Sequence, residues 1–527
     1  MCVIRITFLF YLNLLFSTIT FAQSSETTEL EALKALVLPS TIEDKPVVLT
    51  QENLSKYQSF LIAPMASLVQ QGMFSARLVR ETGQNLNPSS LWLQASRENE
   101  KNFRLGSDGW IQRQPDTVGE VTSYTGFPFG TADAIANEPD PKIKGQKIVW
   151  SLSAVPGIDA QLLYGIEMSW FDRNRTTKQA TGLYYREYLH GKIIPPPPVD
   201  PVGKDPQSER LYLPKFSKAL DWRELFQLLQ PAVVFGYASV TYRYREPIED
   251  DTWTYSPVLG RSRRVLESNR TDPILGSELN LNDLFMLSIR QNRVQAEVVA
   301  EKFVLAPFSL RDQMRFETES DDGELTPDGT ANAASIPTAR GYYRNRKGHS
   351  VGVLWNAETA LFPGLPGWIP TTIALAPRKV WVVETHPLDP FSTDGTEVLF
   401  VDQQTFLPFY KVTYDRKGSF LRWSMMAWSI VVGGDERTRS PVPLFIVSVN
   451  KTGEHATSIE TQYVRRLIAD TQLRRKVNLL FDIREHDKRA PKKETPPPDQ
   501  EGQSKPNDKS AEEKPAPVET PEADIHD

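Results

Sequence analysis

The chain has 527 residues, of which 40% are hydrophobic and 24% are charged, and its formal net charge at pH 7 is −6. This small net charge excludes a strongly basic protein that binds nucleic acid through bulk electrostatics. The single cysteine is Cys2, so no disulfide is expected in the mature protein, and its stability must come from a large hydrophobic core.

Residues 1–22 have the pattern of a secretory signal peptide. Arg5 supplies a positive charge, residues 6–16 are mostly apolar, and Thr20-Phe-Ala22 places small residues before the expected cleavage site. The apolar run is shorter than the roughly 20 residues that a membrane-spanning helix needs. An uncleaved N-terminal anchor is the alternative, whereas the absence of a cysteine at the site argues against a lipid-anchored lipoprotein. We therefore expect secretion, with cleavage near Ala22.

Four segments have apolar residues at the spacing of amphipathic helices, namely 26–38, 52–74, 216–229 and 279–287. Pro64 is expected to kink or split the second of these helices. Helices of this kind bury one face against a neighbouring element, which is expected here to be a sheet.

Most of the remaining chain predicts β-strands, because aromatic and β-branched residues alternate with polar ones between turn residues. The expected strands are 147–152, 161–171, 180–189, 233–245, 341–355, 379–384, 397–401, 406–414, 420–432 and 444–449. Residues 253–265 also have the pattern of a strand, a turn and a second strand. This composition predicts a mainly β fold with a few helices, in one domain over residues 23–484. Loop insertions are expected near 195–206 and 318–337.

Residues 485–527 are rich in Pro, Glu and Lys and contain few apolar residues. Such a segment buries too little surface to offset the entropy of ordering it, so it is predicted to be a disordered tail.

Candidate catalytic and metal-binding residues are few. The six histidines show no metal-ligand spacing, and no activated nucleophile or phosphate-binding loop is recognisable. His386 lies near Glu384, Asp389 and Asp394, which is compatible with a metal or acid–base cluster. However, the Thr-His-Pro-Leu-Asp-Pro sequence around it is typical of a turn, and we favour that interpretation. The sequence therefore predicts no enzyme, no cofactor and no metal site.

A basic cluster and several aromatic residues are the candidate binding residues. Arg261, Arg263 and Arg264 form the one dense basic cluster of the body, suited to a phosphate, a lipid headgroup or an acidic partner. The alternative is a solvated strand whose arginine stems pack along apolar surface. Large aromatic residues on alternating strands belong either to the core or to a ligand cavity. Those predicted to line a cavity or bind a partner are Trp253, Tyr255 and Trp381.

Several motifs together resemble a known family of secreted Gram-negative proteins. They are Trp-x-Tyr-x-Pro with the Arg-rich strand (253–265), Val-Trp-Val-Val-Glu (380–384), Leu-Phe-Val-Asp (399–402), Tyr-Asp-x-x-Gly (414–418) and Leu-x-Trp (421–423). With Gly-Phe-Pro-Phe at 126–129, the chain is similar over residues 50–450 to the domain-of-unknown-function thirteen-twenty-nine family, whose members are commonly called outer membrane lipoprotein-sorting proteins.

That family is grouped with the LolA/LolB-like carriers, so the resemblance implies a large, curved, half-open antiparallel β-barrel covered by amphipathic helices. It also implies a periplasmic protein that binds a lipid or the acyl chain of a lipoprotein. The implied partners are an inner-membrane transporter of the resistance-nodulation-division type or an outer-membrane protein. A different possibility is a non-catalytic periplasmic scaffold or sensor that binds a protein partner.

Overall fold

The structure is a computed structural model. The residues that it describes are 29–36, 38–40, 47–80, 84–115, 124–155, 161–189, 220–310, 314–315, 337–338, 342–343, 353–432, 439–466 and 481. All of them belong to one unit that spans residues 1–490. The predicted signal peptide, the loop near 195–206, the tail after residue 485 and nearly all of the loop 318–337 lie outside the described residues. Within the described ranges, no helix is long and apolar enough to cross a membrane.

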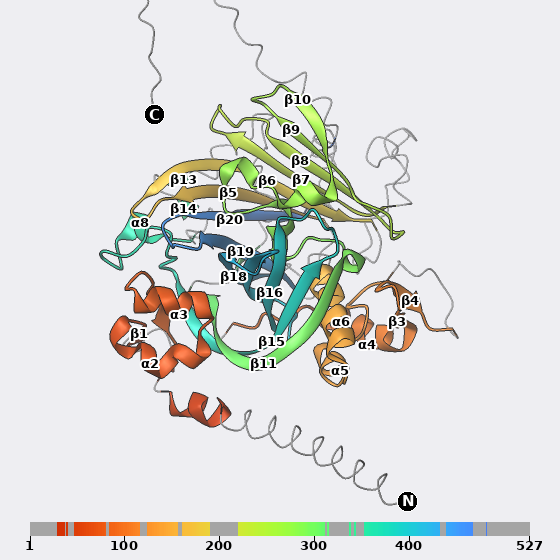
Figure 1. The fold of residues 1–527 in the computed structure, drawn as a ribbon, viewed down its shortest axis with the longest axis horizontal. Coiled ribbons are helices and arrows are strands. Elements are labelled where there is room, and N and C mark those ends of the chain that lie inside the picture. Colours follow the sequence, from red (N-terminus) through yellow and green to blue (C-terminus); the bar gives the residue numbers. More distant parts are fainter. Residues whose placement is uncertain are drawn as a thin grey trace, which may run out of the picture. The chain divides into compact units, whose positions relative to one another are not determined.

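A large sheet dominates the fold (Figure 1). Its described strands are β1 (Val47–Val48), β2 (Arg77–Leu78), β5 (Gln161–Phe171), β6 (Thr176–Tyr188), β7 (Leu220–Gln230), β8 (Ala238–Tyr244), β9 (Asp251–Ser256), β10 (Arg261–Val265), β11 (Val294–Ser309), β12 (Met314–Arg315), β15 (Ile373–Pro387), β16 (Asp394–Asp402), β17 (Pro408–Asp415), β18 (Phe420–Val432), β19 (Arg439–Asn450) and β20 (Ala456–Arg466). Two small separate ladders join β3 (Phe103–Leu105) to β4 (Ile111–Arg113), and β13 (Pro337–Thr338) to β14 (Tyr342–Tyr343).

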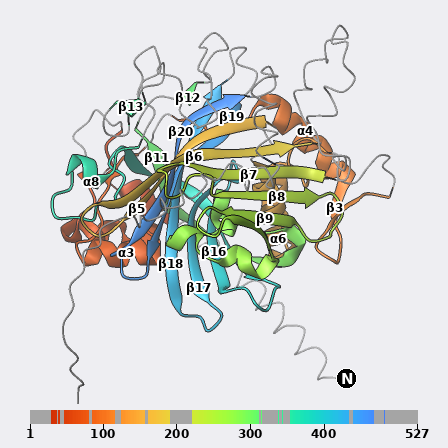
Figure 2. The same cartoon turned by 90° about the horizontal axis from the view of Figure 1, so that it is seen from above.

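The main path of the sheet runs β1-β2-β15-β16-β17-β18-β19-β20-β5-β6-β7-β8-β9-β10. Neighbours along this path are antiparallel except for the short β2–β15 pair. In the described part of the chain, the end strands β1 and β10 do not pair with each other, so the sheet is open. Figure 1 shows that β11 and β15 bend strongly, and Figure 2 shows β5 to β9 lying side by side. The predicted fold class, a mainly β protein with a large curved antiparallel sheet and a few helices, is confirmed.

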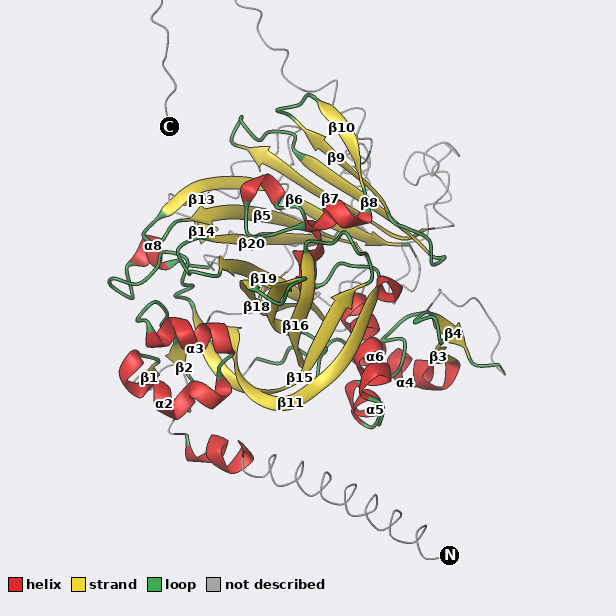
Figure 3. Cartoon of the chain, viewed as in Figure 1, coloured by secondary structure: helices red, strands yellow, loops and turns green. Residues whose placement is uncertain are grey.

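The helices flank the bent strands β11 and β15 on two sides (Figure 3). The α-helices with complete bounds are α2 (Leu54–Tyr57), α3 (Ala63–Gln70), α4 (Ser90–Asn102), α5 (Ala132–Ala136), α6 (Pro141–Ala154) and α8 (Asn356–Thr359). Short 3-10 helices are η1 (Gln51–Asn53), η2 (Gln58–Phe60), η5 (Glu267–Thr271), η6 (Ile274–Gly276), η7 (Leu281–Met286) and η8 (Gln291–Arg293). Helix α6 approaches β11 so closely that a Cβ at Gly145 would lie 2.7 Å from the backbone of Ala296.

Two of the predicted elements are wrong in type. The predicted helix 216–229 is strand β7 where it is described, and the predicted strand 147–152 lies inside helix α6. Strand β7 is buried on both faces between β6 and β8, so its apolar residues do not alternate with polar ones as those of a half-buried strand do. Helix α6 starts at Asp140, whose side chain accepts hydrogen bonds from two backbone amides, with a proline in its first turn.

The predicted helix 52–74 is divided, and α3 begins anew at Ala63 with Pro64 in its first turn. This outcome agrees with the expected split at Pro64. The predicted helix 279–287 is instead the irregular 3-10 segment η7. Strands β11 and β20 were not predicted, because glutamates and other polar residues interrupt their apolar pattern.

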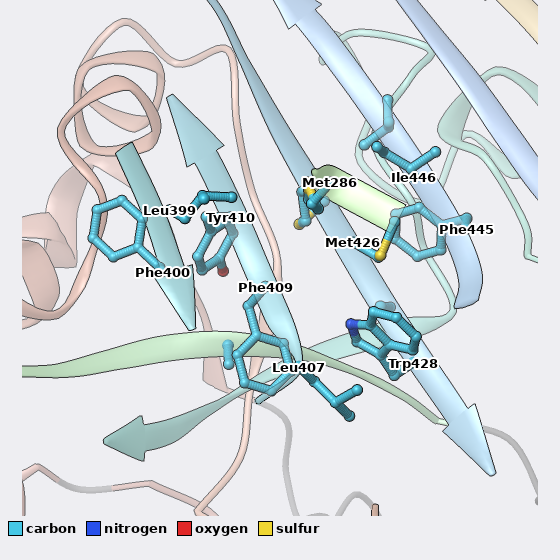
Figure 4. Packing of buried hydrophobic residues seen from close by; sticks show 14 of the residues in the cluster. Met286, Leu399, Phe400, Leu407, Phe409, Tyr410, Met426, Trp428, Phe445 and Ile446 are labelled. Atoms are coloured by element: carbon cyan, nitrogen blue, oxygen red, sulfur yellow. The ribbon is translucent and has the colours of Figure 1, made fainter. Parts of the chain in front are cut away.

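Most buried apolar side chains form one continuous cluster. Figure 4 shows part of it, with Tyr410 of β17 beside Leu399 and Phe400 of β16, and Met286 of η7 beside Met426 of β18. Met286 and Phe409 have no exposed surface. A smaller second cluster, which includes Leu163, lies on the other face of strands β5 to β9.

Candidate binding site

Strands β5 to β8 have two buried faces, and the irregular chain 266–293 covers one of them. We call this face the inner face and residues 266–293 the inner segment. Four short 3-10 helices, η5 to η8, make up most of the inner segment. Its apolar side chains, including Leu281, Phe285 and Met286, are buried in the main cluster. The inner segment therefore fills the space against this face of the sheet.

Phe285 is the central contact of the inner segment with the sheet. Its ring centroid lies 6.3 Å from that of Tyr164, 5.4 Å from that of Tyr184 and 6.5 Å from that of Trp428. The guanidinium carbon of Arg186 lies 4.9 Å from the Phe285 ring centroid. These four residues come from three strands, β5, β6 and β18, and we call them the Phe285 box. The box combines flat apolar surface with one cationic group.

The backbone of the inner segment is strained at the same place. Leu275, Phe285 and Met286 have φ values of 50°, 54° and 67°. A bulky residue in this left-handed region is uncommon. Each one costs of order 1–3 kcal/mol of folding free energy and persists only where the surrounding structure holds it there. Backbone hydrogen bonds of its short turns hold the segment together, and side-chain contacts hold it against the sheet.

Buried ion pairs fix one side of the inner segment. Asp283 of η7 pairs with Lys411 of β17 and with Arg422 of β18, and Lys411 also contacts Glu397 of β16 at 2.8 Å. Burial alone would raise the pKa of Asp283, but the two cations outweigh it and hold its pKa below the usual value. Burial raises the pKa of Glu397, only partly offset by Lys411. Lys411 has no exposed side-chain surface, so its ammonium depends wholly on these two carboxylates.

An arginine-rich cluster fixes the other side. Four arginines there are at most 6% exposed, namely Arg186, Arg243, Arg270 and Arg290. Arg243 and Arg290 share the carboxylate of Asp250, at 2.7 Å and 2.9 Å, and Arg186 pairs with Glu224.

Arg270 forms no ion pair with a carboxylate of the described residues. It donates instead to Asn282 Oδ1 at 2.9 Å and Thr252 Oγ1 at 2.9 Å. Burial lowers the pKa of Arg270. The cluster is therefore held by neutral oxygens as well as by carboxylates.

Two cavities lie where the inner segment begins. The smaller one, of about 20 Å³, is lined by Arg270 and Arg290 among others and has room for about one water molecule. The larger one, of about 340 Å³, opens at the surface beside Leu266, Leu388 and Phe391. Both cavities are lined by Glu249 and Glu267. The apolar residues at the surface cavity are well exposed, with Phe391 at 80%.

The residues predicted to bind a ligand or partner lie in three different environments. Trp381 is fully buried in the main cluster and its ring stacks on Phe406, with centroids 5.6 Å apart. Tyr255 is 1% exposed and belongs to the second cluster, on the face away from the inner segment, whereas Trp253 of the same strand is half-buried. The aromatic residues therefore do not meet at one site.

The three predicted arginines lie on the edge strand β10. Arg261 and Arg263 are exposed, and Arg264 is paired with Asp251 at 3.0 Å. The register places Arg264 opposite Trp253. A binding role for the six predicted residues stays a prediction. The sequence did not predict the arginine-rich cluster or Phe285. One signal was available, since the arginine in Tyr242-Arg-Tyr244 lies within the apolar pattern of a strand.

His386 contacts Glu384 on the same strand. Its Nε2 lies 2.9 Å from Glu384 Oε1, and about half of its side chain is exposed. Among the described residues, no group of His, Cys, Asp or Glu is arranged to hold a metal ion.

Two glutamates lie close together on the neighbouring strands β5 and β20. Glu167 lies opposite Glu460 in the register, and Glu460 is 2% exposed. Glu460 accepts hydrogen bonds from Val353 N at 2.9 Å and Trp355 Nε1 at 3.1 Å. Burial raises the pKa of Glu460 well above its usual value, and burial with the charge of Glu358 raises the pKa of Glu167 to about 7. Both carboxyls are therefore stabilised in the neutral form.

Stability is expected to fall as the pH rises from about 4.5 to about 7. In this range the glutamates of the unfolded chain lose their protons, whereas Glu167 and Glu460 in the folded protein keep theirs, so rising pH favours the unfolded state. Glu460→Gln keeps a polar group without the charge, and it should flatten this slope and raise the free energy of unfolding at pH 8 by about 1–3 kcal/mol. Urea unfolding across this pH range tests the expectation. Glu454→Gln, at an exposed ion pair with Arg173, is the control. An unchanged slope in Glu460→Gln would contradict the assignment.

The solved structures that this chain is similar to include three from different organisms. One is a domain named as an outer membrane lipoprotein-sorting protein from Vibrio parahaemolyticus, with 16% identity, coverage of 64% of this chain and 98% of that chain, and a TM-score of 0.37. The second is a DUF1329 family protein from Desulfovibrio piger, with 13% identity, 63% and 95% coverage, and a TM-score of 0.38. The third is a LolA superfamily protein from Nitrosomonas europaea, with 11% identity, 61% and 93% coverage, and a TM-score of 0.31.

Among curated proteins, none matches the sequence. The model of the DUF1329 family, described as proteins of unknown function, matches residues 48–440. This range contains the bent strands β11 and β15, the inner segment and the strands that form the Phe285 box. The chain therefore belongs to the DUF1329 family.

Proposed function

We propose that this protein is a periplasmic carrier that binds a lipid, or the acyl chain of a lipoprotein, against the inner face of its sheet. Phe285 carries the proposal, because a strained residue fills an aromatic box that would suit an apolar ligand. When the inner segment moves away, an acyl chain takes the place of Phe285 and Met286. Burial of such a chain is favourable by about 0.8 kcal/mol per CH₂ group.

The charged groups around the box suit the polar end of such a ligand. Arg186 lies against Phe285 but is already paired with Glu224, whereas Arg270 of the inner segment forms no ion pair with a carboxylate of the described residues. A guanidinium at the edge of an apolar site pairs well with a carboxylate or a phosphate. The ligand that we propose is therefore an acyl chain with an anionic end, and no chemical turnover is expected. A membrane partner, such as a transporter of the resistance-nodulation-division type, would exchange the ligand.

A non-catalytic scaffold or sensor is the second candidate, and one observation favours it. The inner face is filled by the protein's own side chains, with Phe285 at 7% and Met286 at 0% exposure. A filled core needs no ligand, and in that case the exposed edge of the sheet would bind a protein partner.

Titration with a fluorescent fatty acid distinguishes these candidates. The carrier proposal expects saturable binding of about one probe per chain and quenching of tryptophan emission. Because Trp428 belongs to the Phe285 box, Trp428→Phe should remove most of the quenching. Trp92→Phe is the control, since Trp92 packs on Phe127 elsewhere, with ring centroids 5.7 Å apart.

Two results would count against the carrier. Binding that does not saturate would indicate nonspecific adsorption of the probe. Equal quenching in Trp428→Phe and Trp92→Phe would place the probe outside the box. Either result leaves the scaffold as the better explanation.

A further inference from the structure

Two tight turns lie at the same end of the sheet. One connects β7 to β8 through residues 231–236, and the other connects β9 to β10 through residues 257–260. The register pairs Ala238 with Tyr255, so the start of β8 lies beside the end of β9. Figure 1 shows these strands together, with β9 and β10 at the end of the sheet.

Both turns expose large aliphatic side chains. Val233 is 71% exposed, Val258 is 77% exposed and Leu259 is 58% exposed. The turns are well ordered by backbone hydrogen bonds, from Gly236 N to Leu228 O and from Gly260 N to Ser256 O, each 2.9 Å long. Isolated exposed aliphatic residues are common, but three of them at adjacent tips form a small apolar group.

Positive charge lies directly behind these tips. Arg261 and Arg263 are exposed on β10, and within the described residues neither forms an ion pair with a carboxylate. Arg264 differs, because it is paired with Asp251. Neither turn contains an Asp or a Glu. The end of the sheet therefore combines protruding aliphatic groups with two guanidinium groups that have no carboxylate ion pair in the part of the chain that the structure describes.

We propose that this end of the sheet docks on a bilayer surface that carries anionic lipids. Aliphatic side chains at the tips would enter the boundary between headgroups and acyl chains, while Arg261 and Arg263 pair with the lipid phosphates. A protein partner fits less well, because the three aliphatic groups lie on two convex turns rather than in a groove. The inference does not depend on whether the protein carries a ligand.

Sedimentation of the mature protein with vesicles tests the proposal. The protein should bind vesicles of phosphatidylglycerol and phosphatidylcholine, and bind pure phosphatidylcholine vesicles much more weakly. Arg261→Gln and Arg263→Gln should each weaken binding about fivefold, as expected for one basic residue near an anionic membrane. Added salt should weaken the binding of the wild type. Val258→Asp and Leu259→Asp should weaken it further, since each removes an apolar contact and adds a repelled charge.

Matched control variants test whether vesicle binding is specific to this end of the sheet. Val299→Asp changes an aliphatic residue on β11 that is 52% exposed, and Arg173→Gln removes an exposed arginine that is paired with Glu454 at 3.2 Å. Both should bind vesicles like the wild type. The proposal is overturned if the wild type does not sediment with anionic vesicles, or if Val299→Asp weakens binding as much as Val258→Asp. Binding to polyglutamate without binding to vesicles would also overturn it, in favour of an acidic protein partner.

Discussion

Phe285→Ala is expected to tighten the binding of a fluorescent fatty acid by about tenfold while it lowers the free energy of unfolding by about 3–5 kcal/mol. The two effects have one cause. The ring of Phe285 fills the box formed with Tyr164, Tyr184 and Trp428, so its removal leaves an apolar cavity. The folded protein loses packing, but an acyl chain no longer has to displace the ring.

A matched deletion elsewhere in the core gives the control. Phe409 has no exposed surface and packs on Phe308, with ring centroids 5.6 Å apart. Phe409→Ala should lose similar stability without a gain in affinity. Phe285→Leu, a smaller change, should show both effects of Phe285→Ala at reduced size. If Phe285→Ala loses stability and binds the probe no better than Phe409→Ala, the box is ordinary core.

Lys411→Met is expected to lower the free energy of unfolding by about 3–5 kcal/mol at pH 8. The ammonium of Lys411 is fully buried between Asp283 and Glu397, so its loss leaves Glu397 without its cation and Asp283 with Arg422 alone. Their pKa values then rise, and such groups stabilise the folded state only while protonated. The loss should therefore be largest at pH 8 and smaller at pH 5.

Urea unfolding at the two pH values measures this effect. Lys417→Met, in the exposed turn between β17 and β18, is the control and should change stability little. Adding Glu397→Gln to Lys411→Met should restore part of the loss, because one uncompensated charge is gone. A loss below about 1 kcal/mol at pH 8 would mean that water reaches the pair and that the ion pair does not hold the inner segment.

The sequence predicted the β-rich fold class well where local signals agree with burial. Strand β18 was predicted with its observed bounds, and a short turn at 416–419 connects it to β17, which was also predicted as a strand. Strands β17 and β18 are consecutive and pair with each other, so the residue pattern that predicts the two strands also predicts their partner. The sequence failed at β7 and α6, because a fully buried apolar run has the same composition in a strand and in a helix.

By itself, the sequence determined the mainly β class and the family, since both rest on motifs that are local in the chain. Only the tertiary structure decided the candidate site. The Phe285 box brings together Tyr164 of β5, Tyr184 and Arg186 of β6 and Trp428 of β18, and the pairs of Lys411 with Asp283 and Glu397 join three separate elements. Strand order, register and the packing of the inner segment against the sheet set such contacts. A long-range pairing leaves no periodic trace in the chain, so residues such as Arg270 and Phe285 carry no local signal of their role.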